Sequence, residues 1–106
     1  MDKISASHIL IMHKESKDSR SKLNKDEALK LISEIHEEIL KKKSSFKDLA
    51  SKHSDCSSST YGGSLGEFGK GVMVKEFEEN AFKLEVGDVS DPIETEFGFH
   101  IIKRDE

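Results

Sequence analysis

The chain begins and ends with segments whose apolar residues are typical of strands. Residues 4–12 read Ile-Ser-Ala-Ser-His-Ile-Leu-Ile-Met and residues 98–103 read Gly-Phe-His-Ile-Ile-Lys, both rich in β-branched or aromatic side chains. A shorter segment, 65–68, follows Gly62 and Gly63, which allow the chain to turn sharply. The pattern therefore predicts a strand at each end and a short strand between them.

Apolar residues at three- and four-residue spacing predict the helices. Asn24 followed by Glu27 is typical of a capping box, and an apolar stripe then continues along one helix face through Ala28, Leu31, Ile32, Ile35 and Ile39. Lysines 41–43 are expected to end this helix, where positive charge suits the helix dipole. A second helix is predicted to begin at Ser45, and a third spans residues 74–83.

Polar segments separate these elements. Residues 13–23 lack apolar periodicity and are expected to form a loop, residues 54–60 an irregular turn, and residues 86–89 a turn that leads into a strand. Helices that cluster between strands, without a repeat, favour an α+β fold with a mostly antiparallel sheet. The length of 106 residues fits one domain, residues 1–106.

Composition narrows the class of protein. The apolar fraction of 34% still supplies one small core, and no apolar run reaches the roughly 18–20 residues that span a bilayer. The N-terminus has no apolar signal region. A single cysteine cannot form an intramolecular disulfide, which suits a reducing compartment such as cytoplasm or nucleus. We expect a monomer that binds neither a membrane nor, given its net charge of −4, nucleic acid.

Three residues could carry chemistry: His8, Cys56 and His100. Side chains alternate along a strand, so His8 shares a face with Leu10, and the two histidines could meet if the terminal strands pair. Both histidines could equally be hydrogen-bonded core residues. A thiol activated by imidazole would allow a hydrolase, whereas a metal site from His8 and His13 is disfavoured because a spacing of five places them on opposite strand faces.

Several short motifs occur in the order found in one family. They are Ser7-His8-Ile9-Leu10, Leu49-Ala50-Ser51, Ser54-Asp55-Cys56-Ser57-Ser58, Gly62-Gly63-Ser64-Leu65-Gly66, Phe77-Glu78, Ala81-Phe82 with Leu84, Val86-Gly87-Asp88-Val89-Ser90-Asp91-Pro92-Ile93 and Gly98-Phe99-His100-Ile101-Ile102. Together they cover residues 3–105, and the chain resembles the parvulin peptidyl-prolyl cis/trans isomerases. The segment around Cys56 is similar to the Pin-type subclass, which acts on phospho-Ser/Thr-Pro, whereas many other parvulins carry Asp at this position.

The resemblance implies a parvulin/FKBP-like α+β fold, a four-stranded antiparallel sheet surrounded by about four helices. It implies rotation about X-Pro bonds of peptides and proteins without metal, cofactor or covalent intermediate. It also implies a substrate groove whose floor consists of His8, Cys56, Thr95 and His100. The proline pocket is expected at Leu65, Met73 and Phe77, with Phe68 beside them.

The basic loop departs from the Pin-type pattern. Residues 14–25 have a net charge of +3, which leaves −7 for the rest of the chain. Met12 stands where the subclass has a phosphate-binding lysine, and Lys17 and Asp18 stand near its arginine pair. The loop could be an ordinary solvated segment, or it could hold a phosphate site rebuilt from Lys14, Lys17 and Arg20. The second reading favours phospho-Ser/Thr-Pro or acidic-Pro substrates.

Other readings of the sequence remain. A WW domain, which often accompanies the subclass, is not expected within these residues because they contain no Trp. The same groove could serve a non-catalytic domain that binds proline peptides or acts as a chaperone. A thiol hydrolase would instead need Cys56 as its nucleophile.

Overall fold

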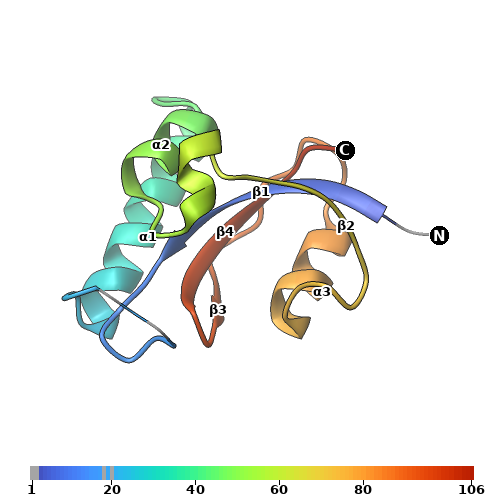
Figure 1. The fold of residues 1–106 in the computed structure, drawn as a ribbon. Helices are drawn as coiled ribbons and strands as arrows, with labels where there is room; N and C mark the ends of the chain where they lie inside the picture. Colours follow the sequence, from blue (N-terminus) through green and yellow to red (C-terminus); the bar gives the residue numbers. More distant parts are fainter. Residues whose placement is uncertain (1–2, 18, 20) are drawn as a thin grey trace.

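The computed structural model describes residues 3–17, 19 and 21–106. Strands and helices alternate irregularly along this part of the chain (Figure 1). In chain order the elements are β1 (Lys3–Ile11), α1 (Lys25–Leu40), α2 (Phe46–His53), the 3₁₀ helix η1 (Ser57–Tyr61), β2 (Ser64–Gly69), α3 (Lys75–Lys83), β3 (Ile93–Thr95) and β4 (Gly98–Arg104).

The four strands form one antiparallel sheet in the order β2-β1-β4-β3. The first and last strands of the chain are therefore the two central strands. Their register pairs Leu10 with His100 and His8 with Ile102. This confirms the expected α+β fold and antiparallel sheet.

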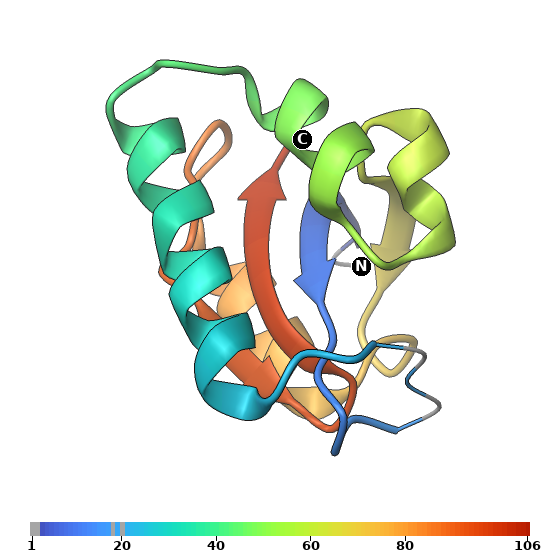
Figure 2. The same ribbon diagram turned by 90° about the vertical axis from the view of Figure 1, so that its left-hand side faces the viewer.

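Helices cover both faces of the sheet, with α1 and α2 on one face and α3 on the other (Figure 2). Alternation along the central strands supplies both layers: Ile9 and Ile101 face α1 and α2, whereas Ala6 and Ile102 face α3. No helix within the described ranges is long and apolar enough to cross a membrane.

Helix α1 begins as its sequence predicts and ends earlier. The Asn24 side chain accepts a hydrogen bond from the Glu27 N–H at 2.8 Å, and the Glu27 carboxylate accepts one from the Asn24 N–H at 2.9 Å. The helix ends at Leu40 rather than in lysines 41–43, because Lys41 is its C-cap and Lys42 turns the chain away with φ = 57°.

Two other short elements differ from their predictions. Residues 57–61, which overlap the segment 54–60 expected to be irregular, form η1, so the expected set of about four helices consists of three α-helices and one 3₁₀ helix in the described chain. Strand β3 has only three residues, too few for alternation to be visible in the sequence. It exists because the turn after Thr95 folds it back onto β4.

Gly63 is a point where the fold tolerates no side chain. Its φ is +87°, and a Cβ there would lie 2.5 Å from the His8 carbonyl oxygen and 3.0 Å from the Ala50 Cβ. Gly66 has a similar φ of +74° but open space around it. A comparison of Gly63 with Gly66 therefore separates the cost of a positive φ from the cost of steric overlap.

We predict that Gly66→Ala lowers the free energy of unfolding by about 1–2 kcal/mol, the cost of a left-handed non-glycine residue. Gly63→Ala should cost about 1–3 kcal/mol more, because the methyl group also displaces β1 or α2. Urea denaturation followed by circular dichroism measures both values. Equal losses in the two variants would contradict the close packing around Gly63.

Candidate functional site

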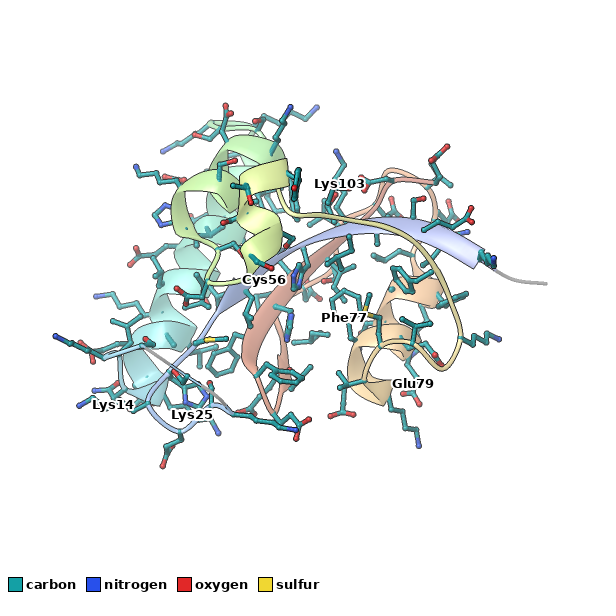
Figure 3. The ribbon with its side chains drawn as sticks, in the orientation of Figure 1. Lys14, Lys25, Cys56, Phe77, Glu79 and Lys103 are labelled. Atoms are coloured by element: carbon teal, nitrogen blue, oxygen red, sulfur yellow. The ribbon has the colours of Figure 1, made fainter. Side chains whose placement is uncertain are left out.

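A cavity of about 600 Å³ opens on the α3 side of the sheet, a size typical of small-ligand sites. Residues from β1, β4, the segment before η1, β2 and α3 line it. Cys56 comes to the cavity from the segment before η1, and Phe77 comes to it from α3 (Figure 3). The lining residues are His8, Leu10, Met12, Lys17, Asp55, Cys56, Ser57, Leu65, Val72, Met73, Val74, Phe77, Phe97 and His100.

The two central strands bring His8 and His100 together. Because His100 pairs with Leu10 in the register, it is the diagonal neighbour of His8 on the same sheet face. Their Nδ1 atoms are 3.1 Å apart, and the rings stack with centroids 5.3 Å apart. Both side chains are buried, at 5% and 4% exposure. The expectation that these histidines meet is confirmed.

Thr95 extends this pair into a chain of hydrogen bonds. Its Oγ1 lies 2.7 Å from His100 Nε2 and accepts a hydrogen bond from the Phe97 N–H at 3.2 Å. A bond between two Nδ1 atoms needs a proton on one of them only, so the tautomers of both rings are linked. If His100 Nδ1 donates, the Thr95 hydroxyl donates to His100 Nε2, and a neutral His8 carries its proton on Nε2.

Burial keeps His100 uncharged. Desolvation, aided by repulsion from His8, lowers the pKa of His100 to about 3. A neutral His100 ring has one N–H, which fits one donated and one accepted hydrogen bond with His8 and Thr95. His8 Nε2 is also buried, and it has no nitrogen or oxygen partner among the described residues. His8 Nε2 therefore ends this series of hydrogen bonds as a buried atom without a hydrogen-bond partner among the described residues.

The segment before η1 is bound to the free edge of β1, and this places Cys56 over the cavity. Ser54 Oγ accepts hydrogen bonds from the N–H groups of Leu10 and Cys56, at 3.0 and 3.4 Å. Asp55 donates its N–H to the Leu10 carbonyl at 2.7 Å, and its carboxylate accepts the Met12 N–H at 2.8 Å. The segment Ser54-Asp55-Cys56 thus occupies the hydrogen-bonding groups at the edge of β1 that β2 leaves free.

Cys56 is an acidic thiol. The nearby His8 imidazole, and to a smaller extent Ser58, lower the pKa of Cys56 to about 6, although partial burial opposes the shift. The described part of the chain contains no group of three His, Cys, Asp or Glu side chains that could hold a metal ion.

The apolar wall of the cavity contains the three residues expected in the proline pocket, Leu65, Met73 and Phe77. Phe77 presents its ring edge-on to both imidazoles, with centroid distances of 5.5 Å to His8 and to His100. The aromatic wall and the histidine pair are therefore in direct contact.

Phe68 and Thr95 do not line the cavity, although the sequence places both at the site. Phe68 is 5% exposed and packs behind Phe77, with ring centroids 6.2 Å apart. Thr95 is buried behind His100. Both residues support lining side chains instead of facing a ligand.

Two of the three cations expected around a phosphate lie among the described residues, and they line different hollows. Lys17 lies at the cavity, where its ammonium is 3.8 Å from the Glu96 carboxylate and 5.7 Å from the centre of the Phe97 ring. Lys14 lines a different hollow with Asn24 and Lys25. Arg20 lies outside the described residues.

Some lining residues were not assigned to the site from the sequence. Leu10 and Met12 could have been, because they share a strand face with His8. Val72, Val74 and Phe97 carried no such signal. They reach the cavity from irregular segments whose path only the folded chain defines.

This α+β fold and site define the class of protein. The family model for the PPIC-type PPIase domain, described as a rotamase, matches residues 8–106. The chain belongs to this family and is a parvulin-type peptidyl-prolyl cis/trans isomerase.

Individual relatives agree over nearly the whole chain. The peptidyl-prolyl cis-trans isomerase Pin1 of Digitalis lanata is 46% identical over 97% of this chain and 96% of its own length. The pin1 of Schizosaccharomyces pombe is 50% identical over 96% of this chain but only 62% of its own. Among solved structures, the isomerase ESS1 from Candida albicans has a TM-score of 0.93 at 39% identity, covering 96% of this chain and 62% of that one.

The thiol pKa gives a test of the site. We predict that alkylation of Cys56 by iodoacetamide is fast above about pH 7 and slows as the pH falls through about 6, because the thiolate is the nucleophile. His8→Ala should move this midpoint upward. His36→Ala, on α1 and outside the cavity lining, should leave it unchanged. A midpoint near the ordinary thiol value of about 8.5 in the unmodified protein would contradict the contact between Cys56 and His8.

Proposed function

We propose that the cavity isomerises X-Pro bonds by binding the twisted amide more tightly than either planar form. Amide resonance sets a barrier of ~18–20 kcal/mol to this rotation. No bond has to break, so binding energy realised only in the twisted state is sufficient. Lowering the barrier by about 7 kcal/mol corresponds to about 10⁵-fold acceleration.

In this proposal Leu65, Met73 and Phe77 hold the pyrrolidine ring. The observation that carries it is that all three side chains line the cavity, with Leu65 and Met73 packed against the apolar cluster that contains Phe77. Twisting converts the proline nitrogen to a pyramidal amine and removes partial negative charge from the carbonyl oxygen. A wall that holds the ring while the preceding carbonyl rotates in a poorly solvated space favours that state.

His8, His100 and Thr95 act in the proposal as a rigid polar floor. The bonds of 3.1 and 2.7 Å and the burial of all three side chains support a positioning role. A general base is not needed, since no proton is transferred. Cys56 borders the carbonyl as a weakly hydrogen-bonding wall, although its low pKa also makes it a competent nucleophile.

We further propose a preference for a phosphorylated or acidic residue before proline. The positive charge of Lys17 at the cavity supports this preference. The nearby Glu96 carboxylate reduces the strength of the preference, because it competes with the substrate for that charge. Lys17 is held over Phe97 and through its backbone N–H, which donates to the Glu96 carbonyl at 2.8 Å. The cation is thus oriented at the cavity mouth.

Truncation of the proposed ring pocket should impair catalysis without a nucleophile being involved. We expect Met73→Ala and Leu65→Ala each to lower kcat/KM about 10- to 100-fold, since roughly 1.5–3 kcal/mol of apolar contact is lost. A protease-coupled assay on Ala-Pro peptides measures this. Leu40→Ala, which truncates a leucine that is 64% exposed at the end of α1, is the matched control and should keep full activity.

Cys56→Asp separates the two chemistries in the same assay. The variant should retain kcat/KM within about tenfold, because Asp preserves a polar wall but cannot form a thioester. Loss of a true nucleophile costs several orders of magnitude. A burst phase, an acyl-enzyme at Cys56, or complete loss of turnover in Cys56→Asp would refute the non-covalent mechanism. Full activity of Met73→Ala and Leu65→Ala would refute the pocket.

The substrate preference predicts that kcat/KM for phospho-Ser-Pro and Glu-Pro peptides exceeds that for Ser-Pro and Ala-Pro by about fivefold, the effect of roughly 1 kcal/mol from an exposed ion pair. Lys17→Ala should remove the difference, and added salt should reduce it. Lys14→Ala, outside the cavity, is the matched control. Equal turnover of phosphorylated and unphosphorylated peptides would rule the preference out.

A further inference from the structure

The segment between β2 and α3, residues 70–74, is a partly exposed part of the cavity wall. It supplies Val72, Met73 and Val74 to the cavity but contains no regular secondary structure. Val72 is 67% exposed and Gly71 is exposed. A wall that grips a ring must nevertheless keep its side chains in place, so the contacts that hold this segment decide how well it works.

One side chain on α3 reaches back to hold it. The Glu78 carboxylate accepts a hydrogen bond from the Gly71 N–H at 2.6 Å. Glu78 lies in the first turn of α3, directly after Phe77, and does not itself line the cavity. The bond joins the segment that carries Met73 to the helix that carries Phe77.

The backbone of residues 70–74 has few other contacts near Gly71, so the hydrogen bond to Glu78 matters for its position. Gly71 has φ = +90°, and no atom lies within 4 Å of where a Cβ would stand. Side-chain packing at this position therefore does not hold the segment in place. The N-cap of α3, Val74, has no side chain that could cap the helix. The ammonium of Lys70, 5.5 Å from the centre of the Phe82 ring, is a second contact, and it precedes the turn at Gly71.

We infer that Glu78 is a positioning residue for the isomerase reaction: through Gly71 it holds Met73 against the proline ring. The inference rests on the proposed function of the pocket. Glu78 touches neither the substrate nor the reacting amide in this scheme. A charge-assisted hydrogen bond to a backbone N–H is stronger than a neutral one, which suits a contact that acts on an otherwise exposed turn.

The test uses the acceptor itself. Glu78→Ala should lower kcat/KM on Ala-Pro peptides about fivefold, equivalent to about 1 kcal/mol, and should speed hydrogen exchange at the Gly71 amide. Glu78→Gln keeps an acceptor oxygen and should retain kcat/KM within twofold. Glu79→Ala is the matched control: it removes the next carboxylate on α3, whose partner is Lys75 at 3.9 Å, and should change neither quantity.

Combination with Met73→Ala distinguishes positioning from a general effect on stability. If Glu78 acts through Met73, then Glu78→Ala should cost little more in a Met73→Ala background, whereas independent effects would multiply. Melting temperatures of all variants, measured in parallel, show whether activity follows folding.

The failures are distinguishable. Wild-type kcat/KM in Glu78→Ala, an equal loss in Glu79→Ala, failure of Glu78→Gln to rescue, or multiplicative effects with Met73→Ala would each overturn the role of Glu78. Wild-type kcat/KM in Met73→Ala would instead overturn the pocket assignment on which the inference rests.

Discussion

The site depends on the pairing of the first and last strands of the chain. Antiparallel register between β1 and β4 makes His8 and His100 diagonal neighbours, with 3.1 Å between their Nδ1 atoms. A shift of one residue would turn one histidine into the α1 and α2 core. Apolar residues on both faces of these strands resist such a shift, because each face is buried under helices. The register between β1 and β4 therefore determines both the hydrophobic core and the polar floor of the cavity.

Other elements complete the site by attaching to this pair of strands. Ser54 and Asp55 bind the edge of β1 beyond the end of its pairing with β2, and so bring Cys56 to His8. Phe77 packs edge-on against both imidazoles and carries α3 with it. A buried, uncharged His100 and an acidic thiol at Cys56 then line the same cavity as the apolar side chains of Leu65, Met73 and Phe77. This contrast suits a reaction in which an amide loses polarity without any bond being broken.

Much of the fold could be predicted because its signals are local. The capping box at Asn24 and the alternation in residues 4–12 determined where α1 begins and which side of β1 carries His8. The ordered motifs of the family added the residues of the pocket. Strand β3 was expected after the turn at residues 86–89 but without bounds, and helix η1 was missed, since three and five residues are too short for a periodic pattern. Helix α1 ends one residue before the lysines expected to end it, with Lys41 as its C-cap, because the chain takes a left-handed turn at Lys42.

The amino-acid sequence by itself determined the class of the fold, because strand alternation and helix capping act over a few residues. Its ordered motifs indicated the family and the candidate residues of the site. Only the tertiary structure decided which of those residues face the cavity. Phe68 and Thr95 lie behind the lining, and Lys14 lies apart from Lys17. It also brought Phe97 and Val72 to the cavity and joined Glu78 to Gly71. These outcomes depend on the path of irregular segments, which long-range packing and hydrogen bonds determine rather than local residue preference.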